Sequence, residues 1–147
     1  MERTLVLLKP DCVSQAICGK VISRFEESGY KILGCKMIKL SAERLREHYA
    51  HIADKPFYPE VEAFMQQTPV IAMVLEGEGI VETMREMLGV TDCLEAVPGT
   101  IREQYGSKNP QDSKMRNVVH ASDSAQAAEK EVWRFFSEDE LFEYQRV

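Results

Sequence analysis

The apolar run VIAMVLEG, residues 70–77, constrains the fold of this chain more than any other segment. It is the most continuous apolar run in the sequence, and its length suits a β-strand better than a helix. A run of this kind is typical of a strand in the middle of a sheet. The sequence therefore predicts a sheet, whose other strands must come from shorter apolar segments.

Those other segments alternate between strand and helix patterns. Residues 14–27 place apolar side chains at helical spacing. Ser41 is a suitable N-cap for one helix, and either Ser122 or Asp123 is suitable for the last helix. The predicted strands are residues 4–8, 30–40, 70–77 and 117–119, and the predicted helices are residues 14–27, 41–49, 60–67, 79–88 and 122–136.

Residues 89–116 interrupt this alternation. The segment has no periodicity and is punctuated by Pro98, Gly99, Gly106 and Pro110, so a long loop is expected, and loops of such length are usually functional. The order of elements predicts an α+β fold with a ferredoxin-like split βαβ arrangement: a four-stranded antiparallel sheet with helices packed on it and a long loop before the last strand. The length and the absence of repeats predict one domain over residues 1–147.

The net charge limits the kinds of partner that the protein can bind, and the cysteine pattern indicates the redox state of its thiols. The net charge of −6 argues against general nucleic-acid binding and against an anionic membrane surface, because both require a basic face. There is no signal-peptide pattern and no apolar stretch long enough to span a membrane, so we expect a cytoplasmic protein. No CxxC pair occurs among the four cysteines, which are expected to be reduced: Cys12, Cys18, Cys35 and Cys93.

The segment NVVHASDS, residues 117–124, contains the clearest candidate for chemistry. A lone histidine beside an apolar run is more often a core residue, but His120 has Asn117 before it, Ser122 after it and the start of a helix close by. The N-terminus of a helix favours phosphate. If the chain folds over, Glu131 can hold one imidazole nitrogen and leave the other free as a lone pair.

These residues also resemble a known family. The pattern N-x-x-H-[GA]-S-D at residues 117–123 and Lys-Pro-Asp at residues 9–11 are similar to motifs of the nucleoside diphosphate kinases. The blocks HYAHIADKPFYPEVEAFM, TPVIAMVLEG, MREMLGVTD and PGTIRE extend the resemblance over nearly the whole chain. It implies a ping-pong phosphotransferase in which His120 takes the γ-phosphate of a nucleoside triphosphate and passes it to a nucleoside diphosphate.

The resemblance also implies roles for other residues and partners. The substrates would be ATP and other nucleoside triphosphates and diphosphates, with Mg²⁺ held largely by the nucleotide, and the assembly would be a homohexamer or, less commonly, a tetramer. No protein-bound metal is expected. The implied nucleotide-binding residues are Lys9, Arg85 and Arg102 as phosphate-contacting cations, Tyr49 and Thr91 as hydroxyl donors, Asn117 at the sugar, and Phe57, opposite Val61, as the platform on which the base stacks.

The chain departs from the family pattern at Cys12, Lys55 and Ala121, and its segment 103–116 is longer than usual. Any family contact made from that segment therefore cannot be transferred. Two histidines three apart on a helix, His48 and His51, can chelate a metal, but a third ligand at fixed spacing is lacking, so we interpret them as part of a polar helix face near the nucleotide cleft. Two other functions also stay open: a nucleotide-binding module without activity, and a nucleotide hydrolase.

Overall fold

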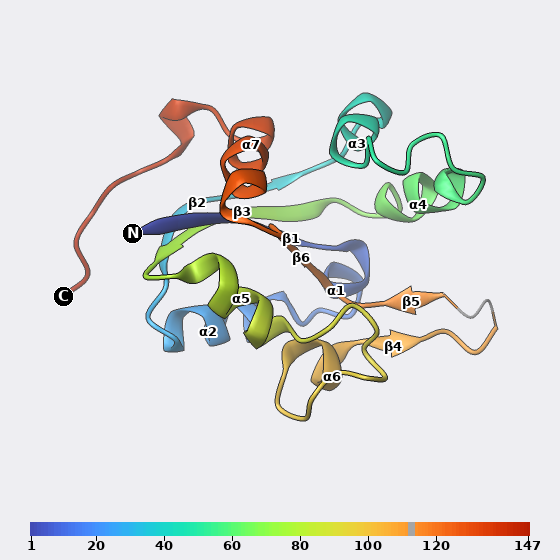
Figure 1. Ribbon diagram of the computed structural model, residues 1–147, viewed down its shortest axis with the longest axis horizontal. Helices are drawn as coiled ribbons and strands as arrows, with labels where there is room; N and C mark the ends of the chain where they lie inside the picture. Colours follow the sequence, from blue (N-terminus) through green and yellow to red (C-terminus); the bar gives the residue numbers. More distant parts are fainter. Residues whose placement is uncertain (112–113) are drawn as a thin grey trace.

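The computed structural model describes residues 1–111 and 114–147 and has a four-stranded antiparallel sheet at its centre (Figure 1). The strand order is β2-β3-β1-β6, with β1 at Glu2–Leu8, β2 at Lys31–Ile38, β3 at Val70–Gly77 and β6 at Val119–Ala121. β3 lies between β1 and β2, so the prediction of a central strand over residues 70–77 is confirmed. The α+β split βαβ fold with helices on an antiparallel sheet is also confirmed.

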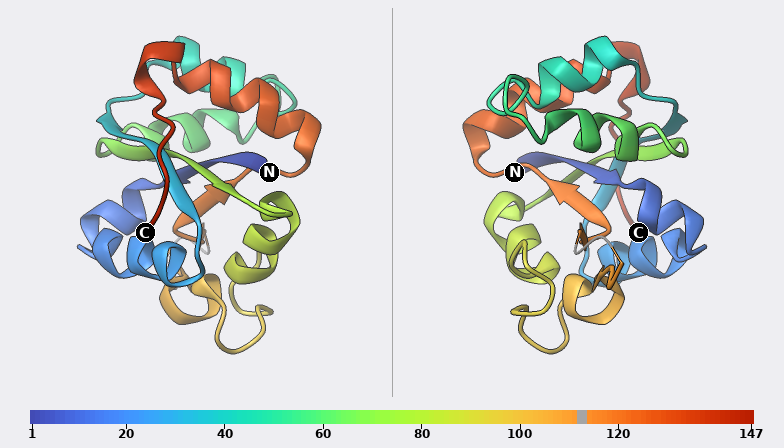
Figure 2. Two further views of the ribbon diagram at one scale, coloured as in Figure 1. Left: turned by 90° about the vertical axis from the view of Figure 1, so that its left-hand side faces the viewer. Right: turned by 90° about the vertical axis from the view of Figure 1, so that its right-hand side faces the viewer.

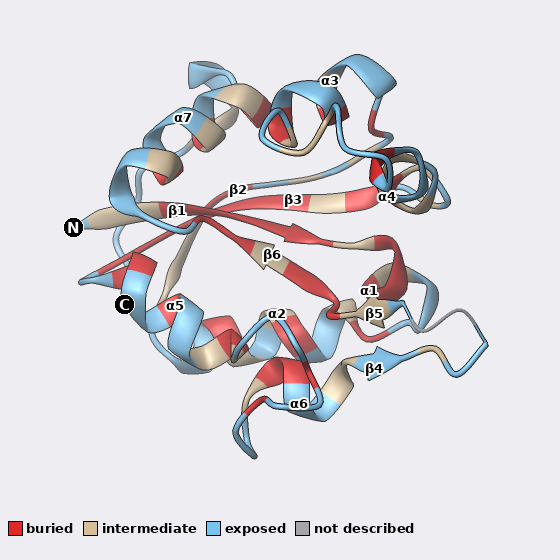
Figure 3. Cartoon of the chain, turned by 45° about the vertical axis from the view of Figure 1, so that its right-hand side comes forward, coloured by how far each residue is buried: buried red, intermediate tan, exposed pale blue. Residues whose placement is uncertain are grey.

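Helices cover both faces of the sheet, and the two core clusters show why. Side chains alternate between the faces along a strand, and in β1 this places Val6 and Leu8 in one core cluster and Leu5 and Leu7 in the other. Figure 3 shows the buried strands between two helical layers. One layer contains α1 (Pro10–Ser14), α2 (Cys18–Glu27), α5 (Ile80–Leu88) and α6 (Ile101–Tyr105), and the other contains α3 (Ala42–His48), α4 (Tyr58–Met65) and α7 (Ala125–Phe135).

Two predicted segments are divided further in the structure. Residues 14–27 do not form one helix, because Ala16 adopts a left-handed conformation, with a φ of 58°, between α1 and α2. Residues 89–116 are not a structureless loop: they include α6, β4 (Ser107–Lys108) and β5 (Met115–Arg116). α6 spans only five residues and each of these strands only two. Elements this short leave no periodic pattern in the sequence.

The last strand and the last helix both begin later than predicted. The strand is residues 119–121 rather than 117–119, because Val118 adopts a φ of 62°, which a β-strand cannot contain. The helix cap is Ser124, whose side chain accepts a hydrogen bond from the backbone of Ala127. The predicted caps Ser122 and Asp123 were wrong, since the Ser122 hydroxyl accepts from the backbone N–H of Leu5 instead.

The chain ends in a short 3₁₀ helix, η1 (Glu138–Glu140), and a tail that returns along β2, as the two views of Figure 2 show. The backbone N–H of Phe142 donates to the carbonyl of Leu33 on β2 at 2.9 Å. Within residues 1–111 and 114–147, no helix has the length and apolar character needed to cross a bilayer.

Candidate active site

His120 lies in β6, and the register of the sheet decides where its side chain points. It is paired with Leu7 of β1, and residues directly opposite each other in an antiparallel pair share a face. Leu7 belongs to the core cluster that also contains Val132 and Phe135 of α7. The imidazole is therefore directed to the side of the sheet where α3 and α7 lie.

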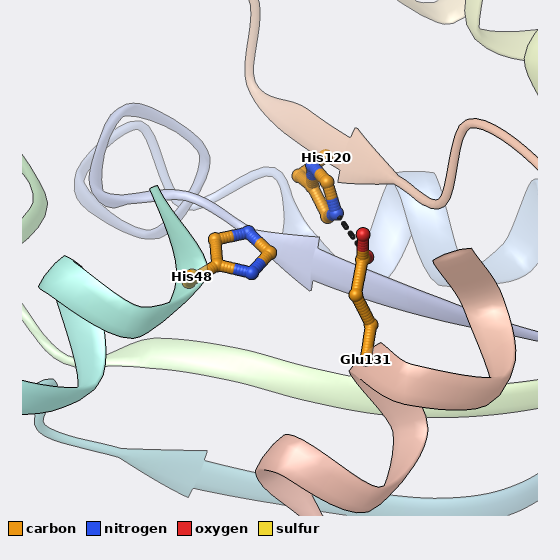
Figure 4. Close-up of side chains that lie close together, drawn as sticks. All are labelled: His48, His120 and Glu131. Atoms are coloured by element: carbon orange, nitrogen blue, oxygen red, sulfur yellow. Dashed lines mark hydrogen bonds and ion pairs between the residues drawn. The ribbon is translucent and has the colours of Figure 1, made fainter. Parts of the chain in front are cut away.

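Glu131, on α7, holds this imidazole. Its Oε1 is 2.7 Å from Nε2 of His120 (Figure 4). The hydroxyl of Ser122 donates to the same oxygen at 3.0 Å. Burial alone would raise the pKa of Glu131, but the hydrogen bond and charge of His120, followed by the charge of His48 and the hydrogen bond from Ser122, outweigh burial and lower this pKa. An ionised carboxylate accepts the proton of Nε2–H, so Nδ1 of His120 keeps its lone pair.

The backbone just after β1 is hydrogen-bonded to the segment just before β6, where Val118 has a strained conformation. Val118, a β-branched residue with a positive φ, is held by the carboxylate of Asp11, which accepts its N–H at 2.9 Å. Next to it, Nζ of Lys9 donates to Asn117 Oδ1 at 2.8 Å. Burial lowers the pKa of Lys9 to about 8. Asp11 was not assigned a role from the sequence, although the Lys-Pro-Asp motif contains it.

Arg102 connects α6 to the residues around His120. Its guanidinium donates to the carbonyls of Val119 at 2.7 Å, Gly89 at 3.0 Å and Asn117 at 3.4 Å. Burial lowers the pKa of Arg102 to about 10. This side chain therefore fixes the backbone on both sides of the strained Val118 in addition to placing a positive charge in the site.

A cavity of about 300 Å³ collects most of the predicted residues. At its edge, Arg85 pairs with Asp123 at 2.6 Å. Burial raises the pKa of the Tyr49 hydroxyl to about 12, so this group is a neutral donor. Ser122 is fully buried beneath the cavity. The predicted residues that line the cavity are Lys9, Tyr49, Arg85, Thr91, Arg102, Asn117, His120 and Glu131.

Phe57 lies apart from this cavity. It is 51% exposed, immediately before α4, and it does not line the cavity around His120. Val61, by contrast, lines an adjoining cavity of about 170 Å³ together with Phe64 and Met115. Lys9 and Tyr49 line both cavities, which places the two side by side. The base-stacking role of Phe57 stays a prediction.

His48 and His51, the two histidines three apart in the sequence, both line the cavity around His120. His51 is exposed, whereas His48 is buried and packs edge to face on His120, with ring centroids 4.7 Å apart. Among the described residues, ligand atoms of His48, His120 and Glu131 do lie within 4.8 Å of one another. Hydrogen bonds from Arg134 to His48 and between His120 and Glu131 compete with a metal for these atoms.

The geometry defines a class of protein. A neutral imidazole is a nucleophile near neutral pH, a carboxylate orients it, and lysine and arginine side chains line the cavity in front of it. Cations around a nucleophile are what phosphoryl transfer requires, because the reaction moves charge onto phosphate oxygens. The fold and the site are those of a phosphotransferase with a histidine nucleophile.

Comparisons with known proteins give the family. The model of the nucleoside diphosphate kinase family matches residues 2–141. A nucleoside diphosphate kinase of Rhodopirellula baltica is 45% identical over 147 residues, covering 100% of this chain and 93% of the relative, and that of Pyrococcus horikoshii is 47% identical over 146 residues, covering 99% and 92%. The chain belongs to the nucleoside diphosphate kinase family, as the sequence motifs indicated.

Solved structures agree with this assignment. A halophilic nucleoside diphosphate kinase from Halobacterium salinarum in complex with CDP has a TM-score of 0.91 and 39% identity, covering 99% of this chain and 93% of that chain. A transition state mimic of the Borrelia burgdorferi enzyme with bound vanadate and ADP has a TM-score of 0.90 and 30% identity, covering 99% and 92%. The fold of this chain is therefore the fold of the family.

Proposed function

We propose that the chain transfers the γ-phosphate of a nucleoside triphosphate to a nucleoside diphosphate through a phosphohistidine on His120. The observation that carries this proposal is the bond between Nε2 of His120 and Glu131, which leaves Nδ1 as the nitrogen with an available lone pair. The cavity that His120 lines also has Lys9 and Arg102 in its wall. The nucleophile and the cations thus belong to one site.

The reaction consists of two displacements. In the first, Nδ1 of His120 forms a bond to the γ-phosphorus while the bond from that phosphorus to the bridging oxygen breaks, and the nucleoside diphosphate leaves with the electron pair. In the second, a terminal oxygen of another diphosphate attacks the same phosphorus and the P–N bond breaks. Glu131 stabilises the positive charge that develops on the imidazole in the first step.

Cationic side chains supply the electrostatic part of the mechanism. We assign Lys9, Arg85 and Arg102 to the phosphates, Tyr49 and Thr91 to hydroxyl contacts, and Asn117 to the sugar. Mg²⁺ fits as an ion carried by the nucleotide, because the two carboxylates described in the cavity wall, Glu131 and Asp123, are already paired with His120 and Arg85. When bound, Mg²⁺ neutralises charge on the phosphate oxygens.

Base recognition is proposed to rest on stacking. The relatives whose structures match this chain carry a cytidine nucleotide in one case and an adenosine nucleotide in another. Stacking on Phe57, opposite Val61, uses the π-face that every base has, so it discriminates weakly between bases. We therefore propose that this enzyme accepts several nucleoside diphosphates.

The setting of the reaction is proposed from the sequence and the family. The chain works as one domain over residues 1–147, in the cytoplasm, within a homohexamer, with a tetramer as the alternative. The net charge of −6 supports binding of small nucleotides rather than of nucleic acids. Light scattering at micromolar protein concentration would contradict the hexamer if it returned the mass of a single chain.

Labelling with γ-³²P-ATP and Mg²⁺, without an acceptor, tests the proposal. One phosphoryl group per chain is expected, labile in acid and stable in base, and GDP, CDP or UDP should remove it. His120→Ala should not label. A protein that only binds nucleotides would take up no label, a hydrolase would release phosphate without an acceptor, and an acid-stable phosphoprotein would place the group on a serine such as Ser122.

A further inference from the structure

A second charged side chain of α7, that of Arg134, contacts His48. Nη1 of Arg134 lies 3.1 Å from Nδ1 of His48, and its Nε lies 3.4 Å from Oε1 of Glu47. The Arg134 side chain is only 18% exposed, whereas that of Glu47 is 61% exposed. The contact between Arg134 and His48 is therefore made by a largely buried side chain.

The chemistry of the two groups fixes the direction of this hydrogen bond. A guanidinium has donors and no acceptor, so Nδ1 of His48 must accept. A neutral imidazole that accepts at Nδ1 carries its proton at Nε2. The contact with Arg134 thus selects one tautomer of His48 and one orientation of its ring.

The ring of His48 is in turn packed against the proposed nucleophile. Its plane makes an angle of 82° with the imidazole of His120, and on another side it meets Phe135 at 76°, with ring centroids 5.2 Å apart. Figure 4 shows His48, from α3, and Glu131, from α7, converging on His120. The imidazole of His120 is held by Glu131 at Nε2 and confined by the ring of His48.

We propose that Arg134 is a positioning residue for the reaction of His120: by donating to Nδ1 of His48, it fixes the tautomer and orientation of the ring that packs on the nucleophile. The effect of Arg134 on the tautomer of His48 is a property of the free protein, and only its effect on the rate at which His120 is phosphorylated rests on the proposed function. Arg134 does not itself line the cavity, and the residue of the cavity wall to which it donates is His48. Its influence must therefore pass through His48.

The charge of Arg134 supports the same role. Burial first, and then the neighbouring groups His120, Arg134 and His51, lower the pKa of His48 to about 3, while Glu131 acts in the opposite direction. A neutral His48 leaves Glu131 to His120 and Ser122. If the positive charge of Arg134 is removed, the pKa of His48 rises, and a protonated His48 would compete for that carboxylate and repel positive charge on His120 as the pH falls.

Imidazole NMR tests the structural claim without any turnover. In protein labelled with ¹⁵N-histidine, long-range ¹H–¹⁵N correlations report which ring nitrogen carries the proton, and His48→Asn assigns the signals among the three histidines. The free protein should show His48 protonated at Nε2 and not titrating between pH 5 and pH 8. Arg134→Leu should yield a mixture of tautomers and displace the His120 signals. His48 protonated at Nδ1 in the unaltered protein, or tautomers unchanged by Arg134→Leu, would overturn the proposal.

Single-turnover phosphorylation of His120 tests the kinetic claim. Arg134→Leu should slow this step about fivefold at pH 8, the loss typical of one positioning hydrogen bond, with little change in KM for the nucleotide. Arg134→Lys, which keeps a charge and a donor, should recover part of the rate.

A double mutant and a matched control separate this role from general damage. In a His48→Asn background, Arg134→Leu should have no further effect on the rate, because the residue through which it acts is gone. Glu47→Gln removes the exposed partner of Arg134 and should leave both the tautomer and the rate unchanged. Additive losses in the double mutant would refute the proposed route. Failure of the unaltered protein to label on His120 would instead refute the proposed function, with the NMR result still standing.

Discussion

The inner and outer parts of the nucleotide cleft are built differently. Around His120 the groups are buried and already paired: Glu131 Oε1 receives hydrogen bonds from both His120 and Ser122. Farther out, beside α4, Phe57 is half exposed, and the ion pair between Lys114 and Glu60 lies at the surface at 3.2 Å. The inner part is organised before any nucleotide binds, so ordering it costs little on binding.

This contrast has a functional meaning under the proposed reaction. The phosphoryl group is the same in every nucleoside triphosphate, so a rigid site can be matched to it. The base differs from substrate to substrate, and exposed side chains can adapt to each one. Rates should therefore depend strongly on substitutions at the inner part, and substitutions at the outer part should act mainly on KM.

The largest effect is expected at Glu131. Glu131→Ala removes the acceptor that selects the tautomer of His120, and phosphorylation of His120 should slow by about 10²-fold or more, as when the carboxylate partner of a catalytic histidine is lost. Stopped-flow measurement of the first half reaction gives this rate. Glu131→Gln, which keeps an acceptor oxygen without the charge, should recover part of it. If Glu131→Ala instead reacts within a few-fold of the rate of the unaltered enzyme, the reaction at His120 does not depend on Glu131, and the proposed difference between the inner and outer parts is wrong.

A smaller and different effect is expected at Phe57. If the base stacks on this ring, Phe57→Ala should raise KM about tenfold for purine and pyrimidine nucleotides alike, while kcat changes little. Steady-state kinetics with GDP and CDP as acceptors would measure both constants. Phe142→Ala, on the tail and also exposed, is a matched control that should leave both unchanged. A fall in kcat with KM constant would place Phe57 with the inner part of the cleft.

The sequence predicted the inner part better than the outer part, and the physical reasons can be traced to particular residues. His120, Lys9 and Asn117 lie in short motifs whose spacing is set by the backbone of the site itself, and the structure brings these three residues to one cavity. The hydrogen bond between His120 and Glu131 was predicted only on condition that the last helix folds back over His120. The structure meets this condition, because the sheet register directs His120 to the face that α7 covers.

Other features depend on long-range contacts that leave no local pattern. The positive φ of Val118 makes the last strand begin two residues later than predicted. The N–H of Val118 donates to the carboxylate of Asp11, which lies 107 residues earlier in the chain. Arg134 reaches His48 across 86 residues. The hairpin of β4 and β5 was read as a loop because two-residue strands carry no periodicity.

The smallest effect is expected where the hairpin meets α4. Nζ of Lys114, next to β5, and the carboxylate of Glu60 on α4 are both largely exposed, and exposed ion pairs contribute about 0–1 kcal/mol. Lys114→Ala should therefore leave kcat unaltered and change KM by about twofold or less, and even that difference should fade in high salt as the charges are screened. Glu60→Gln removes the charge of the other member of the pair and should change KM to a similarly small extent. A double-mutant cycle, with KM measured at low and high ionic strength, gives the coupling between the two residues. A tenfold rise in KM that salt does not diminish would mean that Lys114 contacts the nucleotide directly. The outer part would then contain a fixed recognition residue, contributed by the segment in which this chain is longer than its family pattern.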